Sequence, residues 1–340
     1  MKMTPEQTTD NKTIPVYILS GFLGSGKTTL LVKLLAYWKS KGMTPAVVMN
    51  ELGEVNLDGE IIGKDVSMAE ILGGCICCSV RGDLAPQLVE LVQSSSPDVI
   101  VIEATGAANP VEILDGIADT SLYVKLQIRE LISVVDSIHL LDTYRKQKGK
   151  TFRLMQEQIR AASQLLLNKI DLVTEEERQE LVECIRRWNP HAEIHLTNYC
   201  ATPPTAILRE NELPGVSADH RSESAQEESH NSSESSHTHS HDHVMAYTHY
   251  FSKPINSVQF ESWLKQLPRD IYRAKGIVTF SDTNSRFLFQ FAYRETDFTK
   301  LRSSDRLEDV GVFIGEHFSK TEIEQSLRQL EHDNSRDSSI

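Results

Sequence analysis

The feature that most constrains the fold is an eight-residue segment near the N-terminus, GFLGSGKT at positions 21–28. It matches the pattern G-x-x-x-x-G-K-[ST] at every fixed position. The preceding run, PVYILS, is typical of a buried strand, and the following residues, TTLLVKLLAYW, have the apolar spacing of an amphipathic helix. A strand, a glycine-rich turn and a helix in this order predict a phosphate-binding loop, in which backbone N–H groups face a phosphate at the helix N-terminus. A glycine turn that matches by chance is the alternative.

The side chains of this loop predict a nucleotide site. We expect Lys27 to neutralise charge on the β- and γ-phosphates, which makes it a catalytic as well as a binding residue. The hydroxyl of Thr28 is expected to bind Mg²⁺. The nucleotide-binding residues predicted in this segment are Gly21, Gly24, Ser25, Gly26, Lys27, Thr28 and Thr29.

The chain from residue 14 to 208 alternates short β-branched runs with amphipathic helices. The runs VIVIE and LISVV are apolar throughout, which indicates strands buried on both faces, as in a parallel sheet covered by helices. We therefore expect an α/β domain with a doubly wound, mostly parallel P-loop sheet. Its expected strands are 15–20, 46–50, 98–103, 130–136, 164–168 and 193–196, and its expected helices are 27–41, 83–92, 110–118, 151–162 and 175–188.

The remainder of the chain divides into a linker and a second domain. Residues 209–244 are dominated by Ser, Glu and His, which predicts a flexible linker. Residues 245–333 are expected to form a smaller α+β domain with one sheet face exposed. Residues 1–13 are predicted to be a disordered tail, and 334–340 a second tail. The expected elements are strands at 245–251, 272–280, 285–293 and 309–313 and helices at 257–267 and 321–332.

Two helices carry the sequence pattern of a capping box. Thr174 is followed three residues later by Glu177, and Thr321 by Glu324. In this pattern the threonine hydroxyl accepts from a backbone N–H of the first turn, and the glutamate accepts from the N-cap N–H. We therefore expect helices to begin at these two threonines.

A second nucleotide motif, NKID at positions 168–171, closes the apolar run QLLLN. The carboxylate of Asp171 can accept hydrogen bonds from the N1–H and the exocyclic amine of guanine, whereas adenine offers neither group at that edge. Leaving such a carboxylate unpaired costs about 1–3 kcal/mol, so the pairing selects GTP over ATP. Asn168 is expected to support the loop, and the stem of Lys169 to cover the base. Asn and Asp also end strands as ordinary turn residues, but the upstream P-loop favours guanine recognition.

Glu103 and Gly106 follow the apolar run VIVIE. An acid at the end of a central strand, opposite a P-loop, commonly organises Mg²⁺ through water. Gly106 is expected to donate a backbone N–H to the γ-phosphate and so to sense its loss. Both residues are therefore catalytic candidates, with an ordinary strand-ending loop as the alternative.

Three of the five cysteines lie within four residues, in GGCICC at positions 73–78. Three thiolates, from Cys75, Cys77 and Cys78, suit Zn²⁺ or Cu(I) far better than Mg²⁺ or Ca²⁺. The chain has no second C-x-x-C pair to complete a structural zinc site. A site with three sulfurs and an open or carboxylate position is suited to passing a metal on. Buried inert thiols and a redox-sensing cluster are the alternatives.

These motifs together resemble the CobW family of P-loop GTPases. The resemblance is carried by GFLGSGKTTLL, NELGEVNLD, GGCICC, EATGAANP and NKIDL, in this order and spacing. It implies a P-loop GTPase domain, a family-specific C-terminal domain, and GTP hydrolysis coupled to transfer of a metal held by Cys75, Cys77 and Cys78. Many relatives have ENEFGE where this chain has MNELGE at 49–54. The resemblance therefore implies Glu51, rather than position 49, as a contributor near the metal or Mg²⁺.

The predicted linker carries a cluster of histidines, of which His237, His239, His241 and His243 lie in HTHSHDH. Neutral imidazoles bind Zn²⁺, Ni²⁺ or Co²⁺, and a flexible chain can wrap them around an ion. We expect a weak metal-collecting arm that raises the local metal concentration near the cysteines. A solvated spacer is the alternative.

The composition limits the partners and the compartment. A formal net charge of −13 argues against nucleic acid or an anionic membrane as the main partner. No run of about 18 apolar residues exists to span a bilayer. The polar N-terminus lacks a secretory signal, and the odd number of cysteines fits no disulfide framework, so a cytoplasmic location is expected.

The sequence thus predicts a GTP-hydrolysing zinc metallochaperone that uses GTP, Mg²⁺ and Zn²⁺. Its expected partner is a client apo-metalloprotein, to which hydrolysis would release zinc. The alternatives are a metal-sensing regulatory GTPase and a GTPase that assists cobalt or nickel insertion. The oligomeric state, a monomer or a nucleotide-dependent dimer, is left open.

Overall fold

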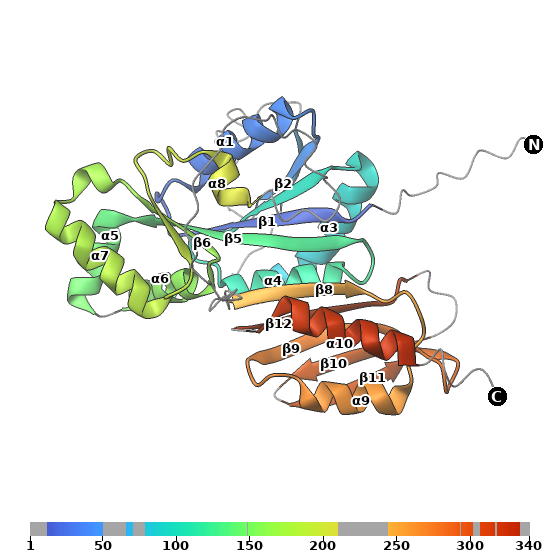
Figure 1. Ribbon diagram of the computed structural model, residues 1–340. Coiled ribbons are helices and arrows are strands. Elements are labelled where there is room, and N and C mark those ends of the chain that lie inside the picture. Colours follow the sequence, from blue (N-terminus) through green and yellow to red (C-terminus); the bar gives the residue numbers. More distant parts are fainter. Residues whose placement is uncertain are drawn as a thin grey trace, which may run out of the picture.

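A computed structural model describes residues 12–49, 66–70, 79–147, 149–209, 244–292, 294–301, 307–316 and 318–333. Its first half is built on a seven-stranded sheet in the order β3-β2-β4-β1-β5-β6-β7 (Figure 1). Every strand pair in this sheet is parallel, as the uniformly apolar strands predict. The strands are β1 (Ile14–Ser20), β2 (Pro45–Met49), β3 (Ser67–Glu70), β4 (Val99–Glu103), β5 (Leu126–Asp136), β6 (Gln164–Asn168) and β7 (Glu193–Leu196).

Helices cover both faces of this sheet, because alternate strand residues point to opposite sides. Val16 and Ile18 of β1 join one buried cluster, whereas Tyr17 and Leu19 join the other. The second cluster packs under α1 (Lys27–Ser40) and α8 (Pro204–Leu208). The helices over the first cluster are α3 (Ser79–Ser95), α4 (Pro110–Thr120), α5 (Ser137–Lys146), α6 (Lys150–Ala161) and α7 (Glu175–Trp188).

The carboxyl ends of the central strands meet at one edge of the sheet. β1 pairs with β4, and Leu19 lies opposite Glu103. On the other side β5 pairs with β6, and Asp136 lies opposite Asn168. In open parallel sheets, ligands bind at this edge where the strand order reverses. The P-loop, Glu103 and the NKID segment therefore share one edge, as their positions at strand ends predict.

Among the described residues, the elements that were not predicted from the sequence are β3, α5, α8, a short 3₁₀ helix at Ile170–Leu172 and a C-terminal strand, β11 (Glu295–Lys300). Strand β5 begins at Leu126, four residues before the predicted start. Its first half alternates buried and half-buried residues, LQIRE, so it lacks the continuous apolar run that identified the other strands. The capping box predicted at Thr174 and Glu177 is confirmed, with both hydrogen bonds present.

The C-terminal half contains an antiparallel five-stranded sheet in the order β11-β10-β9-β12-β8. Helix α10 begins at Lys320, and the hydroxyl of Ser319 accepts from the N–H of Glu322, so the capping box predicted at Thr321 is wrong. The serine lies three residues before that N–H, which is the geometry an N-cap requires. The remaining elements are β8 (Val244–Tyr250), α9 (Ser257–Gln266), β9 (Ile271–Phe280), β10 (Ser285–Ala292), β12 (Val310–Glu316) and α10 (Lys320–Asp333).

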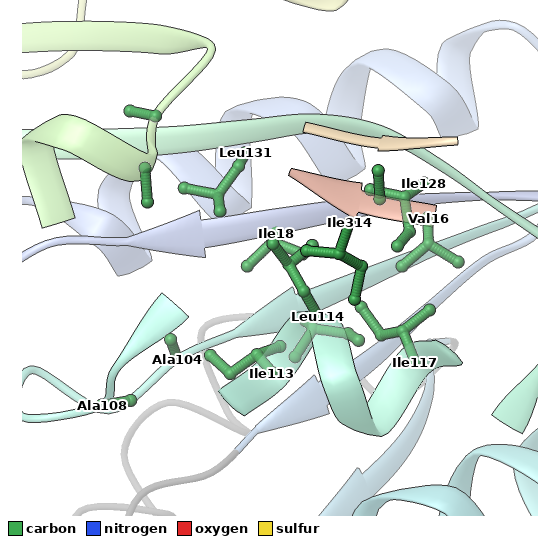
Figure 2. Close-up of a cluster of buried hydrophobic side chains, with 14 of the residues drawn as sticks. Val16, Ile18, Ala104, Ala108, Ile113, Leu114, Ile117, Ile128, Leu131 and Ile314 are labelled. Carbon is green, nitrogen blue, oxygen red and sulfur yellow. The ribbon is translucent and has the colours of Figure 1, made fainter. Parts of the chain in front are cut away.

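The expectation that one face of this sheet is exposed is wrong. One face packs beneath α9 and α10 through an aromatic cluster that includes Phe260 and Phe313. The other face contributes buried residues to the same cluster as the first sheet, and Ile314 of β12 is 2% exposed. Figure 2 shows Ile314 beside Leu114 and Ile117 of α4. The two sheets therefore share one apolar core, which continues through α4.

Ion pairs flank this shared core. Asp115 and Asp119 lie one turn apart on α4, and they pair with Arg273 and Lys275, two residues apart on β9. The Tyr250 hydroxyl of β8 donates to the carbonyl oxygen of Leu126 at 3.1 Å. Figure 1 shows β8 as the strand of the C-terminal sheet that runs beside β5. The side chains of Arg273 and Lys275 are therefore bound to the nucleotide domain.

Within the described part of the chain, no helix has the length and apolar content that crossing a membrane requires.

Candidate nucleotide-binding site

The P-loop lies between β1 and α1, as its sequence predicts. Gly21, Gly24 and Gly26 all have positive φ angles, of 131°, 74° and 115°, which L-residues with a side chain rarely adopt. A Cβ at Gly21 would lie 2.2 Å from the carbonyl oxygen of Val134, so this position has no room for a side chain. The loop conformation therefore depends on its glycines.

The side chains of the P-loop divide between the interior and the surface. Lys27 is buried, and its Nζ donates to the carbonyl oxygens of Gly21 and Phe22 at 3.0 and 3.4 Å. The lysine ammonium thus lies inside the curl of the loop. Ser25 is also buried, and its hydroxyl has no hydrogen-bond partner among the described residues. Thr29 is exposed on the first turn of α1.

Thr28 and Glu103 come together across the edge of the sheet. The Thr28 hydroxyl donates to Oε1 of Glu103 at 3.1 Å, and Glu103 is only 3% exposed. A hydroxyl and a carboxylate oxygen at this separation are the hard oxygen ligands that Mg²⁺ prefers. The donor set therefore fits a magnesium ion, which Thr28 and Glu103 would hold.

Gly106 lies against the P-loop. A Cβ at this position would be 2.6 Å from the backbone nitrogen of Leu23 and 3.1 Å from its Cα. The 104–109 loop therefore touches the P-loop backbone at a point where only glycine fits. This contact places the predicted phosphate-sensing residue beside the phosphate-binding loop.

The side chain of Asn168 connects the NKID segment, which is expected to bind the base, to the P-loop, which is expected to bind the phosphates. Its Nδ2 donates to the carbonyl oxygen of Ser25 at 2.8 Å. Its Oδ1 accepts from the Thr197 hydroxyl at 3.1 Å and from the Cys200 N–H at 3.0 Å. The side chain is 3% exposed, so these bonds are shielded from water. These bonds fix Asn168 to the P-loop and to the loop after β7, with partners that the sequence did not identify.

Lys169 and Asp171 lie at the open side of this segment. Lys169 has a φ of 61°, and its Nζ pairs with Oδ2 of Asp136 at 2.6 Å. Oδ1 of Asp136 also accepts from the N–H of His139 at 3.1 Å, as the N-cap of α5. Asp171 is exposed on a short 3₁₀ helix, Ile170–Leu172. Asp136 therefore orients the lysine that flanks the candidate base site.

The loop after β7 is a part of the site that the sequence did not reveal. Tyr199 and Cys200 both have a φ of 50°, and Cys200 is fully buried with its Sγ 3.5 Å from the carbonyl oxygen of Gly26. Burial raises the pKa of the Cys200 thiol from 9.0 to about 11, so the group stays protonated at neutral pH. The segment TNYC has no recognisable motif, and only the fold brings it to Asn168.

The residues predicted to bind the transferred metal lie outside the described residues, unlike Thr28, the predicted ligand of Mg²⁺. This applies to Cys75, Cys77 and Cys78, to Glu51, and to His237, His239, His241 and His243. In the ranges that the structure describes, no three His, Cys, Asp or Glu residues are grouped so that they could hold a metal. Cys184 and Cys200, which are described, are both buried free thiols.

Residues 15–196 match the model of the CobW/HypB/UreG nucleotide-binding domain, which is more than half of the chain. The chain belongs to the CobW/HypB/UreG family. Residues 244–331 match the cobalamin synthesis protein CobW C-terminal domain. The resemblance inferred from the motifs is therefore confirmed, and it extends over both halves of this CobW-family protein.

Curated relatives of this CobW-family protein carry metal-related names. The zinc-regulated GTPase metalloprotein activator 1 of Dictyostelium discoideum is 32% identical over 57% of this chain and 48% of its own length. The zinc chaperone YeiR of Escherichia coli is 34% identical over 50% of each chain. The chain thus spans about half the length of these two relatives. Among solved structures, the Zn(II)-bound YjiA GTPase of E. coli aligns with a TM-score of 0.46, at 22% identity, over 94% of this chain and 99% of that one.

Replacing Asn168 should lower the stability of the protein, because its side chain bonds both to the P-loop and to the loop after β7. In Asn168→Ala the Ser25 carbonyl, the Thr197 hydroxyl and the Cys200 N–H lose their buried partner, at a cost of about 1–3 kcal/mol in the free energy of unfolding. Urea denaturation measures this loss. Gln259→Ala, on the exposed surface of α9, is the control and should change stability by less than about 0.5 kcal/mol. Equal losses in the two variants would contradict the assignment.

Proposed function

We propose that this protein is a GTP-hydrolysing metallochaperone. It would bind zinc as its cargo through Cys75, Cys77 and Cys78 and transfer it to a client apo-metalloprotein. Membership of the CobW/HypB/UreG family supports the nucleotide half of this proposal. The names of the two relatives, a zinc chaperone and a zinc-regulated GTPase, support the cargo half.

The observation that carries the nucleotide half is the contact between Thr28 and Glu103 at 3.1 Å, beside a P-loop in its glycine-dependent conformation. The N–H groups of such a loop bind phosphate oxygens at the positive end of a helix. Magnesium, when bound by Thr28 and Glu103, supplies positive charge to the phosphates. Lys27 adds a second positive charge from within the loop. Stabilisation of negative charge by these groups is the main requirement of phosphoryl transfer.

Guanine selectivity is assigned to Asp171. Its carboxylate is exposed and lies three residues after Asn168, which is fixed to the P-loop. The base would therefore lie at a defined distance from the phosphates. An Asp at this place accepts from the two guanine donors, and it offers adenine no matching group.

The packing of α3 on α4 supports a coupling between nucleotide and cargo. Helix α3 begins at Ser79, directly after Cys78, and α4 begins at Pro110, shortly after Gly106. The two helices approach closely, because a Cβ at Gly116 of α4 would lie 2.7 Å from a methyl carbon of Leu84 on α3. A shift of the Gly106 loop that moved α4 would therefore also displace α3, the helix that follows the cysteines.

The proposal also includes predicted residues that lie outside the described part of the chain. Glu51 would contribute near the metal or Mg²⁺, and His237, His239, His241 and His243 would collect metal weakly near the cysteines. The domain limits at 14–208 and 245–333 and the cytoplasmic location remain predictions of the same kind. A monomer and a nucleotide-dependent dimer both remain compatible with the proposal.

The nucleotide half is tested by changing Asp171. Asp171→Asn should weaken binding of GTP at least tenfold and strengthen binding of xanthosine triphosphate, because the amide donates where the carboxylate accepted. Fluorescence titration with labelled nucleotides measures both affinities. Asp142→Asn, on the exposed surface of α5 where Asp142 pairs with Lys146, is the matched control and should bind GTP normally. Wild-type protein that binds ATP as tightly as GTP would contradict the proposal.

The cargo half is tested at the cysteines. Cys77→Ser should lower the number of zinc ions bound per chain, since serine is a poor ligand for zinc at neutral pH. The GTP affinity measured on zinc-free protein should be unchanged. Equilibrium dialysis with metal analysis measures the stoichiometry. Cys184→Ala is the control, because that thiol is buried and burial raises its pKa to about 12, which keeps it protonated. Identical zinc content in wild type and Cys77→Ser would refute the assignment of the cargo site.

A further inference from the structure

A buried glutamine, Gln158, lies next to the candidate nucleotide site. Gln158 lies on α6 and is 2% exposed. Its helical neighbours on the same face, Met155 and Ile159, are apolar and belong to the core of the first sheet. Burying an amide among apolar side chains is unfavourable unless its polar atoms are hydrogen-bonded. The presence of Gln158 at this position therefore requires a partner.

That partner is the loop that follows Glu103. Nε2 of Gln158 donates to the carbonyl oxygen of Gly106 at 3.1 Å and to that of Ala108 at 3.4 Å. A glutamine amide has two N–H donors, and both are directed at this one loop. The contact spans about fifty residues of sequence, so it is a tertiary bond and not a local turn.

The same loop is held from the opposite side by the P-loop strand. The Ala104 N–H donates to the carbonyl oxygen of Leu19 at 2.9 Å, and Gly106 lies against the backbone of Leu23. The loop is therefore fixed between the P-loop and the side chain of Gln158. Because a trans peptide is planar, holding the Gly106 carbonyl towards α6 turns the next N–H, that of Ala107, away from α6, where it donates to the Thr105 hydroxyl at 3.3 Å.

We propose that Gln158 is a positioning residue for the phosphate-sensing loop. It holds the carbonyl oxygens of Gly106 and Ala108 towards α6, so that the opposite side of the loop stays turned to the P-loop. The proposal rests on the proposed function, because it assigns a regulatory contact to the same GTP site. Gln158 touches neither nucleotide nor magnesium in this role, and it acts only through the loop.

If Gln158 positions this loop, replacing it should change the ratio of the affinities for GTP and GDP. Contacts with the terminal phosphate exist only in the GTP state, so a displaced loop should weaken GTP binding more than GDP binding. A purely structural glutamine would lower stability and leave the ratio of the two affinities unchanged. The ratio therefore separates a positioning role from a packing role.

The test compares nucleotide affinities in wild type and Gln158→Leu. The substitution keeps a similar volume and removes both N–H donors. We expect the affinity ratio of a non-hydrolysable GTP analogue to GDP to fall about tenfold, equivalent to about 1.4 kcal/mol. The affinity for GDP itself should change less than twofold. The turnover number should fall with the ratio.

The matched control is Asn189→Leu. Asn189 is also a fully buried amide, and its Nδ2 donates to the carbonyl oxygens of Ile159 and Ala162 at the end of the same helix, α6. This variant should lose stability, yet it should keep the wild-type affinity ratio, because those carbonyls are not part of the sensing loop. A second variant, Gln158→Asn, keeps the amide but shortens its reach by one methylene, and it should lower the ratio in the same direction.

The outcomes distinguish this inference from the function on which it rests. A lower ratio in both Gln158 variants, with a wild-type ratio in Asn189→Leu, supports the positioning role. An unchanged ratio in the folded Gln158 variants, with normal GTP binding by wild type, overturns the positioning role alone. Wild-type protein that binds no guanine nucleotide overturns the proposed function and this inference together. If Gln158→Leu does not fold, Gln158→Asn decides between the first two results.

Discussion

The contact between Thr28 and Glu103 is the constraint on which the rest of the site depends. It exists because β1 and β4 are parallel neighbours whose register places Leu19 opposite Glu103. One strand continues into the P-loop and the other into the Gly106 loop, so the two loops leave the sheet side by side. The close approach of Gly106 to Leu23 follows from the same pairing. The proposed charge stabilisation and the proposed sensing of the terminal phosphate would thus both originate in one strand register.

Helix α4 connects this edge of the sheet to the C-terminal domain. It begins after the Gly106 loop, and its buried side joins a core that includes Ile314 of β12. Its acidic residues Asp115 and Asp119 pair with Arg273 and Lys275 of β9. Partly exposed ion pairs such as these contribute about 1 kcal/mol or less each, so the apolar core supplies most of the attachment and the charges fix its register. The C-terminal domain is therefore placed to follow movements of α4.

The sequence was sufficient for those parts of the site that are determined by backbone conformation and strand order. The P-loop, Glu103 and Asn168 could be predicted because glycine spacing and apolar strands place them without reference to distant residues. The contacts of Gln158 and Cys200 could not, since each depends on a loop brought close by the fold. A polar residue on the buried face of a predicted helix was the available signal for Gln158. Similarly, the covered face of the C-terminal sheet is explained by α4, a partner that local periodicity cannot identify.

The central claim is that the nucleotide state sets the metal affinity of the cysteine motif. The most direct measurement is zinc affinity, by competition with a chelator, for wild-type protein loaded with GDP and with a non-hydrolysable GTP analogue. The account predicts that the GTP-analogue state binds zinc at least tenfold more tightly, since loss of the terminal phosphate should relax the Gly106 loop and, through α4 and α3, the segment that holds the thiolates. Equal zinc affinity in the two states would contradict it.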